Sequence, residues 1–497
     1  MHRRNAILKM PSGRSAGTNR QIVFGKSIAR RIAVGVVGLA LLVAIVGGGF
    51  LTLMAHHFHP APPHPSFPSA TSALDAQRQD IRYFRAVIAL DRSFSPSARS
   101  EANRRLDLLE AFRTVLDGPH LRVALMRIDA LADNGHSRVG DDGRAPSLAL
   151  PVRIAAFSDG LYILRATEAY TDLLGSRVTA IDGQAIDAVM TKLEQLRGGT
   201  HQWRSLLASQ YLTLLDLLYG IDVARDRQHS DWTVETAAGV AVTRRLDALA
   251  SPGGESVPVT RWLSSERFTG TAEMWRSIEP LHALPLSLSH FDTAFRGLPI
   301  PGTCAYYVQL KSNADQGGLS IKAFLSDTEQ QLQRVRPCHV VLDLRYDSGG
   351  DYLNTYRFAR RLPSLLPEEG RIFVLTGPAT FSAGITTIAF IKHADPERIV
   401  ILGEPVGDRL QFFSEGGRAC LPNQPLCVDY ETGKHDYQHA CTDWDACFWL
   451  NYFFGLRVDS LDPDEVIPWS FMEWRTGIDP ILDRAIALSW PTGKVSP

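Results

Sequence analysis

The 497-residue sequence has almost no net charge, and no cysteine precedes residue 304. Its formal charge is −1, but residues 1–31 hold eight Lys and Arg and no acid, which leaves 44 basic and 53 acidic residues in the remainder. A mildly acidic remainder gives no reason to expect a nucleic-acid partner. The 15 histidines do not match a metal-binding spacing such as H-E-x-x-H, so we expect no metal and no cofactor.

Charge is also missing from Ile32 to Ala55, a run of 24 residues. A helix of this length, at about 1.5 Å per residue, spans a bilayer core of roughly 30 Å. The basic flank comes first, so the N-terminus is expected in the cytoplasm and the bulk of the chain in the periplasm or extracellular space. A cleaved signal peptide is the alternative, with small residues near Ala70 and Ala73 as a cleavage site, but its apolar core is usually shorter, about 7–15 residues. We therefore expect an uncleaved single-pass anchor.

The six cysteines all lie in the part that is expected to be exported, where disulfides form. Two pairs are close in sequence, Cys420 with Cys427 and Cys441 with Cys447. Cys304 and Cys338 each begin an apolar run and are expected to bridge neighbouring strands. Unpaired structural thiols are the alternative.

Composition and periodicity divide the chain into seven segments. Residues 56–75 are rich in Pro, His and Ser and read as a stiff spacer, whose four histidines are expected to be solvated. From Gly302, apolar strands alternate with helices, which predicts an α/β domain with a parallel-rich sheet and covering helices. The expected segments are a basic tail (1–31), a transmembrane anchor (32–55), the spacer (56–75), a helical region (76–140), a small strand-rich module (141–200), a mixed region (201–300) and a catalytic core (301–490).

Three short segments carry residues that are able to do chemistry. Val340–Asp351 is a buried strand followed by a Gly-Gly turn, which can aim backbone N–H groups at a ligand or serve only as a tight turn. Thr376–Phe390 places Ser382 at the start of a helix, where a serine often only caps the helix. It lacks the G-x-S-x-G pattern of α/β-hydrolases. Leu131–Gly140 contains His136, and a serine nucleophile needs such a base nearby.

Together these segments resemble the C-terminal processing (tail-specific) peptidases and the tricorn protease core. Residues 343–350 read D-L-R-Y-D-S-G-G, where that family has D-L-R-x-N-x-G-G. Residues 380–383 read T-F-S-A, matching T-x-S-A, and residues 403–407 read G-E-P-V-G, matching G-E-x-x-G. Residues 134–137, N-G-H-S, are similar to the D-G-H-[ST] element of tricorn-like members. The resemblance covers roughly residues 76–490, most closely from 302 to 407.

The resemblance implies a crotonase/ClpP-like catalytic core and a PDZ-like module, whose end is similar to residues 174–183. It implies a serine-type peptidase that hydrolyses protein or peptide substrates. Ser382 would attack the peptide carbonyl with His136 as general base. The backbone N–H of Ala383, with that of Gly349 or Gly350, would form the oxyanion hole.

The chain departs from the pattern at two sites. The processing peptidases have a Lys base shortly after G-E-x-x-G, where this chain has Asp408, so a Ser/Lys dyad is not expected. Asp347 replaces the usual Asn of the Gly-Gly turn, and its charge would oppose an oxyanion unless it points away. An acid should complete the site, and three candidates stand open: Asp462, Asp464 and Glu431.

Two further functions remain compatible with these patterns. A catalytically inactive descendant that binds peptides or other ligands would explain the missing Lys and the Asp347 exchange. A crotonase-type acyl-CoA enzyme fits the sheet pattern, but an exported location argues against it.

Overall fold

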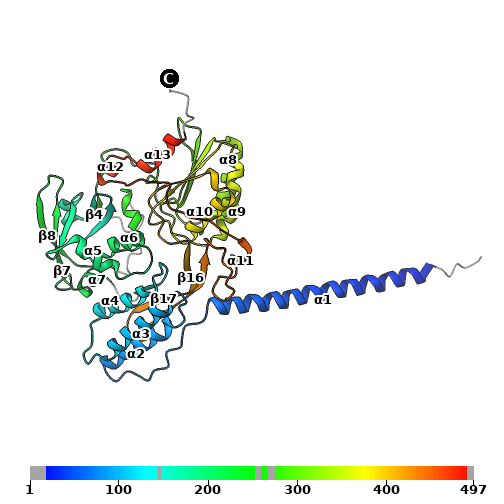
Figure 1. Ribbon diagram of the computed structural model, residues 1–497, viewed down its shortest axis with the longest axis horizontal. Coiled ribbons are helices and arrows are strands. Elements are labelled where there is room, and N and C mark those ends of the chain that lie inside the picture. The colour runs from blue at the N-terminus through cyan, green and yellow to red at the C-terminus, as the bar shows by residue number, and fades with distance from the viewer. Residues whose placement is uncertain (1–17, 144–146, 252–258, 267–274, 490–497) are drawn as a thin grey trace, which may run out of the picture. The chain divides into compact units, whose positions relative to one another are not determined.

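The computed structural model describes residues 18–143, 147–251, 259–266 and 275–489 (Figure 1). The chain divides into a first unit that ends at Phe58 and a second unit that begins at His59. The first unit contains helix α1, Thr18–Phe58. Its Val34–Phe58 part has a mean hydropathy of 2.5 and is long enough to span a membrane. A signal sequence near the N-terminus has the same length and apolar character. The expected apolar helix is thus present, and it continues into the basic flank.

The second unit contains a six-stranded sheet in the order β11-β12-β13-β14-β15-β18. Strands β12 to β18 pair in parallel, and β11 pairs antiparallel at one edge. The parallel sheet predicted after Gly302 is therefore present. Its strands are β11 (Phe295–Pro299), β12 (Ala305–Leu310), β13 (His339–Asp343), β14 (Ile372–Thr376), β15 (Ile399–Gly403) and β18 (Glu465–Val466).

Helices cover this sheet as continuous apolar strands require. On one face, alternate residues such as Val341, Phe373 and Leu375 pack against α13 (Pro480–Leu488). Figure 1 shows α8 (Ile321–Val335), α9 (Leu353–Arg361) and α10 (Ala383–Ala394) together beside the same sheet. Because β13 and β14 are parallel neighbours, the turns that follow them meet at one edge of the sheet.

A buried ion-pair network closes the end of β13. Arg345 bonds Asp343 at 2.7 Å and Asp479 at 2.8 Å, and all three side chains are at most 4% exposed. Burial by itself would raise the pKa of Asp479, but pairing with Arg345 outweighs it and lowers the pKa. Asp479 also caps α13 by accepting from the Leu482 N–H. The network therefore ties the C-terminal helix to the turn that follows β13.

A second sheet of seven strands holds the middle of the chain, with β10-β4-β5-β7-β8 as its main path. It joins strands from residues 141–200 with strands from residues 201–300, since β5 pairs with β7. Its strands are β3 (Val152–Phe157), β4 (Gly160–Thr167), β5 (Arg177–Ile181), β6 (Gln184–Ala185), β7 (His229–Glu235), β8 (Ala241–Asp247) and β10 (Trp275–Ser277). Two further short strands of this part of the chain, β2 (Ser147–Ala149) and β9 (Leu249–Ser251), pair antiparallel with each other.

The third sheet, β1-β17-β16, links the N-terminal helices to the C-terminal half of the chain. Strand β1 (Arg138–Asp141) pairs with β17 (Leu426–Asp436), and β17 pairs with β16 (Gln411–Cys420). This pairing brings residue 138 beside residue 429, almost 300 positions later in the sequence. The sheet therefore sets where the His136 turn lies.

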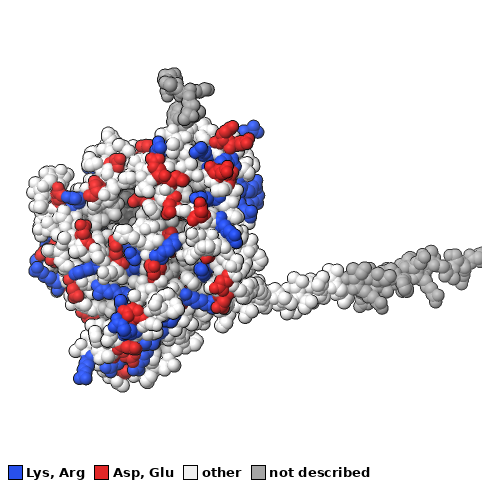
Figure 2. All heavy atoms as spheres, in the orientation of Figure 1, with Lys and Arg blue, Asp and Glu red and all other residues white. Residues whose placement is uncertain are grey.

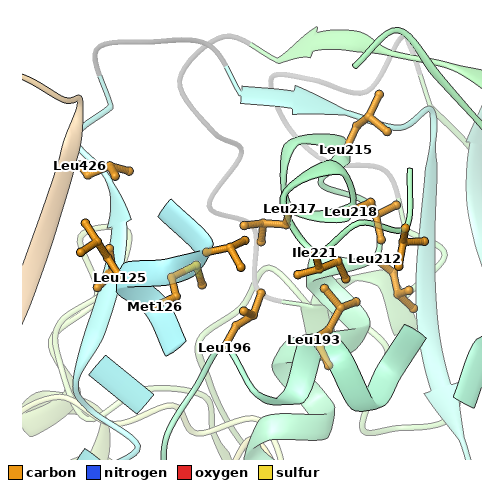
Figure 3. Packing of buried hydrophobic residues seen from close by; sticks show 14 of the residues in the cluster. Leu125, Met126, Leu193, Leu196, Leu212, Leu215, Leu217, Leu218, Ile221 and Leu426 are labelled. Carbon is orange, nitrogen blue, oxygen red and sulfur yellow. The ribbon is translucent and has the colours of Figure 1, made fainter. Parts of the chain in front are cut away.

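Helices and leucine-rich packing hold the N-terminal half together. Figure 3 shows Leu125 of α4 (Gly118–Asp129) near Leu426 of β17, and Met126 of α4 on the side of Leu217 of α7 (Leu215–Gly220). The remaining helices of the second unit are α2 (Ala73–Ile88), α3 (Pro96–Glu110), α4 (Gly118–Asp129), α5 (Ile186–Glu194), α6 (His201–Tyr211), α7 (Leu215–Gly220), α11 (Asn451–Phe454) and α12 (Phe471–Arg475). Short 3₁₀ turns occur at η1 (Ala130–Ala132), η2 (Glu168–Leu173), η3 (Val259–Leu263), η4 (Leu362–Leu365) and η5 (Pro396–Arg398).

The Pro-rich segment after α1 is bonded to the second unit along its length. The carbonyls of Pro60, Pro63 and Pro68 accept hydrogen bonds from Tyr430, Tyr83 and Gln79. The expected spacer is therefore an ordered strap over α2 and β17.

Three disulfides are present: Cys304–Cys338, Cys420–Cys427 and Cys441–Cys447. The first joins the starts of β12 and β13, as neighbouring apolar runs predicted. On the face shown in Figure 2, acidic and basic side chains are interspersed over the second unit.

Candidate active site

Ser382 stands in a strained turn between β14 and α10. Its backbone has φ 52° and ψ −120°, and the Gly384 N–H donates to the Phe381 carbonyl at 2.9 Å. These values describe a type II′ turn, whose second position normally requires glycine. The Ser382 side chain, which is partly exposed, makes no capping hydrogen bond. The helix-cap interpretation of this serine is therefore wrong.

The Gly-Gly turn after β13 lies directly against Ser382. Gly349 has φ 105°, and a Cβ added there would come within 2.7 Å of the Ser382 Cβ and 3.1 Å of the Ala383 N. The Phe381 N–H donates to the Asp347 carbonyl at 2.9 Å, which fixes the two turns to each other. Only glycine at position 349 permits this approach.

The backbone donors around Ser382 differ in what they bond. In the part of the chain that the structure describes, the N–H groups of Ala383 and Gly350 donate no hydrogen bond. The Gly349 N–H instead donates to Asp347 Oδ1 at 3.0 Å. Of the three donors predicted for an oxyanion hole, Ala383 and Gly350 are thus available, and Gly349 is engaged.

His136 reaches the site from the turn before β1. Asn134 holds this turn, because its Oδ1 accepts from the Phe413 N–H at 3.1 Å and its Nδ2 donates to Ser137. Gly135 is packed so closely that an added Cβ would lie 2.9 Å from the Phe381 ring and 3.0 Å from Asp408 Oδ2. The sequence element around His136 is therefore shaped by close packing against the residue that precedes Ser382.

Aromatic rings cover both faces of the His136 imidazole. Its centroid lies 4.4 Å from that of Phe381 and 5.0 Å from that of Phe412, and Phe381 stacks in turn on Trp203 at 4.0 Å. The side chain is 14% exposed. Only the ring edge, which carries the two nitrogens, remains able to interact with polar groups.

Asp408 faces that edge. Its Oδ2 lies 3.6 Å from His136 Nδ1, and its side chain is 1% exposed. The next residue, Arg409, pairs with Asp133 at 2.9 Å and so holds the Asp408 loop to the His136 turn. Neither imidazole nitrogen has a hydrogen-bond partner, so no hydrogen bond joins His136 to Ser382 in this structure.

None of the three acids suggested by the sequence pairs with His136, although Asp462 lines the same cavity as Asp408. Asp464 Oδ2 accepts from the Ile401 N–H at the sheet edge, and exposed Asp462 accepts from Ser460. Glu431 is buried beside Asp91 and Asp129, and burial and these acids raise its pKa well above the usual value. In the sequence, Asp408 stands out only because the processing peptidases have a Lys at this place. Its position one residue after G-E-P-V-G was the signal, because that strand end adjoins the one carrying Ser382.

A second serine–histidine pair in β16 and β17 has a structural geometry. Ser414 Oγ lies 2.8 Å from His435 Nε2. His435 Nδ1 lies 3.1 Å from Asn451 Nδ2, which has only protons to donate. Nδ1 is then the acceptor and Nε2 carries the proton, so His435 cannot take a proton from Ser414. The His435 ring stacks on the other face of Phe412 at 4.9 Å and thereby supports the ring that covers His136.

Asp347 carries a buried carboxyl group beside the turn that holds Ser382. Burial raises its pKa to about 7, and only its bond from the Gly349 N–H opposes this rise. Its Oδ2 has no hydrogen-bond partner, and its Cγ lies 3.2 Å from where a Cβ on Gly384 would stand.

The described residues contain no group of three or more His, Cys, Asp or Glu side chains that could hold a metal ion. A cavity of about 260 Å³ opens beside α10, lined by Ile385 and Val406 and by the acids Asp408, Asp459 and Asp462. The site thus combines a strained serine, an edge-on imidazole, a buried carboxylate, two unengaged N–H groups and a cavity.

Comparisons with known proteins support the fold. No protein-family model and no curated protein matched the sequence. Among solved structures, a CPAF mutant matched with a TM-score of 0.57 and 12% identity, over 85% of this chain and 99% of that chain. Mature CPAF in complex with lactacystin matched with a TM-score of 0.53 and 12% identity, over 84% and 98%. The photosystem II D1 C-terminal processing protease also matched, at a TM-score of 0.36 and 14% identity, over 80% and 93%. The chain has the fold of mature CPAF, and its resemblance to the tail-specific proteases is confirmed at the level of the fold.

Proposed function

We propose that this protein is a serine peptidase, anchored in a membrane by Val34–Phe58 and exposed to an oxidising compartment such as the periplasm. The backbone of Ser382 is the observation that carries the proposal. A non-glycine residue in this conformation costs about 1–3 kcal/mol, and such strain persists mainly where it serves function. Because the side chain forms no cap, the strain has one evident use, which is to present the hydroxyl at the end of α10.

Ser382 Oγ attacks the peptide carbonyl, and His136 Nε2 takes the proton. Asp408 orients the imidazole through Nδ1 and stabilises the imidazolium that forms. The 3.6 Å separation and the unpaired Nε2 fit a site without substrate, where catalytic hydrogen bonds are often long. The N–H groups of Ala383 and Gly350 receive the oxyanion. Each such donor is worth about 2.7–4 kcal/mol of barrier.

The surrounding segments have matching roles. Residues 301–490 form the catalytic core, of crotonase/ClpP-like type. The strands of residues 141–200, together with those of residues 201–300 that share their sheet, form a PDZ-like module that holds protein or peptide substrates. The cavity beside Ile385 is placed to take a substrate side chain.

The alternative is a catalytically inactive protein that binds peptides or other ligands on the same fold. One observation favours it: no hydrogen bond joins His136 to Ser382. Covalent labelling separates the two functions.

A fluorophosphonate probe should label the protein at Ser382. Labelling should disappear in Ser382→Ala and fall strongly in His136→Ala, because the hydroxyl is nucleophilic only beside a base. The readout is in-gel fluorescence of the full-length chain. Ser414→Ala is the matched control and should label like the wild type, since His435 cannot act as its base. Labelling that survives Ser382→Ala contradicts the assignment, and absence of labelling in the wild type favours the inactive alternative.

Asp408→Asn should lower kcat for peptide cleavage by about 10²–10⁴-fold, because the amide neither fixes the imidazole tautomer nor stabilises the imidazolium. Steady-state kinetics on an unfolded protein or peptide substrate measures this. Asp459 lines the same cavity, but its side chain is 87% exposed. The control variant Asp459→Asn should therefore leave kcat unchanged. If Asp462→Asn or Glu431→Gln abolishes activity and Asp408→Asn does not, Asp408 is not the orienting acid.

Ser382→Gly should raise the free energy of unfolding by about 0.5–1 kcal/mol and so unfold at a higher denaturant concentration than the wild type. Glycine relieves the backbone strain, and this gain exceeds the entropic cost of ordering a glycine. Ser95 provides the control, since its side chain accepts from the Ala98 N–H at an ordinary φ of −62°. Ser95→Gly should lower stability by a few tenths of a kcal/mol. A Ser382→Gly protein that is less stable than the wild type would mean that the turn carries no strain.

Asp347→Asn should remove a pH dependence of stability. The folded-state pKa of Asp347 is about 7 against 3.8 for an ordinary Asp, so the folded protein keeps a proton that the unfolded chain loses first. Stability is therefore lost as pH rises from 3.8 to about 7, by about 1.4 kcal/mol per pH unit, and is constant above that range. An Asn side chain at this position resembles the protonated carboxyl group and does not titrate, so the stability of the variant does not fall in this pH range for this reason.

Chemical denaturation of both proteins at several pH values between 4.5 and 8 tests this, because the other carboxylates contribute equally to each. The advantage of the variant should grow up to about pH 7 and then level off. Parallel curves would show that Asp347 is not held protonated.

A further inference from the structure

A disulfide-closed loop near the C-terminus exposes large aromatic side chains. Trp444 is 61% exposed and Phe453 is 73% exposed. They belong to one group, because Trp444 contacts Tyr452 at 5.3 Å between ring centroids and Trp449 contacts Phe453 at 6.2 Å. We call Cys441–Phe454 the aromatic loop. Trp, Tyr and Phe are the side chains enriched where a protein meets the headgroup region of a bilayer.

The aromatic loop is held rigidly on the folded unit. The Cys441–Cys447 disulfide closes its first half. Lys434 of β17 donates its N–H to the Ala446 carbonyl at 2.7 Å and accepts from the Phe448 N–H at 3.0 Å. Arg92 donates to the Asp445 carbonyl at 2.8 Å. The exposed rings are therefore presented from a fixed platform.

The start of the second unit lies at the same loop. His59 Nδ1 is 2.9 Å from the Gly416 carbonyl, and its ring contacts that of Phe448 at 6.5 Å between centroids. The strap continues from there with Pro60 bonded to Tyr430. Residue 59 directly follows Phe58, the last residue of the candidate membrane span. Since consecutive Cα atoms are about 3.8 Å apart, residue 59, which contacts the aromatic loop, directly adjoins the end of the candidate span along the chain.

We propose that the aromatic loop is a second membrane contact, which docks into the headgroup region of the bilayer beside the point where the chain leaves it. This inference rests on the anchoring part of the proposed function. Asp443 and Asp445 flank Trp444, so the contact is apolar and needs no anionic lipid.

The test uses the full-length chain in phosphatidylcholine nanodiscs. All six cysteines are in disulfides, so Phe453→Cys provides a unique site for an environment-sensitive fluorophore. Val240→Cys, in the β7–β8 hairpin at 56% exposure, is the matched control site. Lipids that carry a nitroxide on the choline headgroup should quench roughly half or more of the signal at position 453, since interfacial insertion reaches about 5–10 Å, and little at position 240. Adding Trp444→Asp should reduce the quenching at 453.

Equal quenching at both positions contradicts the docking proposal. A label at position 453 that is shielded from water but not quenched by lipid also contradicts it, and would indicate that a protein partner covers the loop. An alkaline wash separates this failure from that of the anchor. A chain that stays in the bilayer but is not quenched at 453 refutes the docking only. A chain that is washed out refutes the anchor and the docking together, and probe labelling of Ser382 reports on the peptidase independently.

Discussion

The close approach of two turns at one edge of the parallel sheet is the constraint on which the site depends. The Asp347–Gly350 turn follows β13, and the Phe381–Gly384 turn follows β14. One backbone hydrogen bond, from Phe381 to Asp347, and the missing Cβ of Gly349 let them touch. This contact holds Ser382 in a conformation that favours glycine, with the Ala383 N–H close to Gly349. The buried Arg345 network fixes the first turn from behind.

A stack of rings brings the distant parts of the chain to that edge. Trp203, Phe381, His136, Phe412 and His435 follow one another at centroid distances of 4.0 to 5.0 Å. The stack joins α6, the nucleophile turn, the His136 turn and the β16–β17 hairpin. It fixes the plane of the imidazole and leaves only its edge free to meet Asp408. His435, although bonded to a serine, has the structural role of supporting this stack.

Two buried carboxylates occupy opposite electrostatic positions in the site. Asp408 lies against a group that becomes positive during the proposed reaction, so its charge assists. Asp347 lies beside the place where negative charge would develop, and burial raises its pKa to about 7. When protonated it does not oppose the oxyanion. The presence of Asp at position 347, where the family has Asn, is thus compatible with activity near or below neutral pH.

The sequence by itself determined the apolar helix and the parallel sheet, because each depends on local composition or on a period that a short window reveals, whereas it left the pairing of the six cysteines open. It also singled out Ser382, His136, Gly349 and Gly350, through spacing within contiguous motifs. Only the tertiary structure decided that Ser382 is strained rather than capping, that Gly349 is engaged by Asp347, and that Asp408 faces His136. The strain of Ser382 depends on the meeting of two turns about 30 positions apart, and the Asp408–His136 contact on the β1–β17 pairing of residues almost 300 positions apart, which no local pattern encodes.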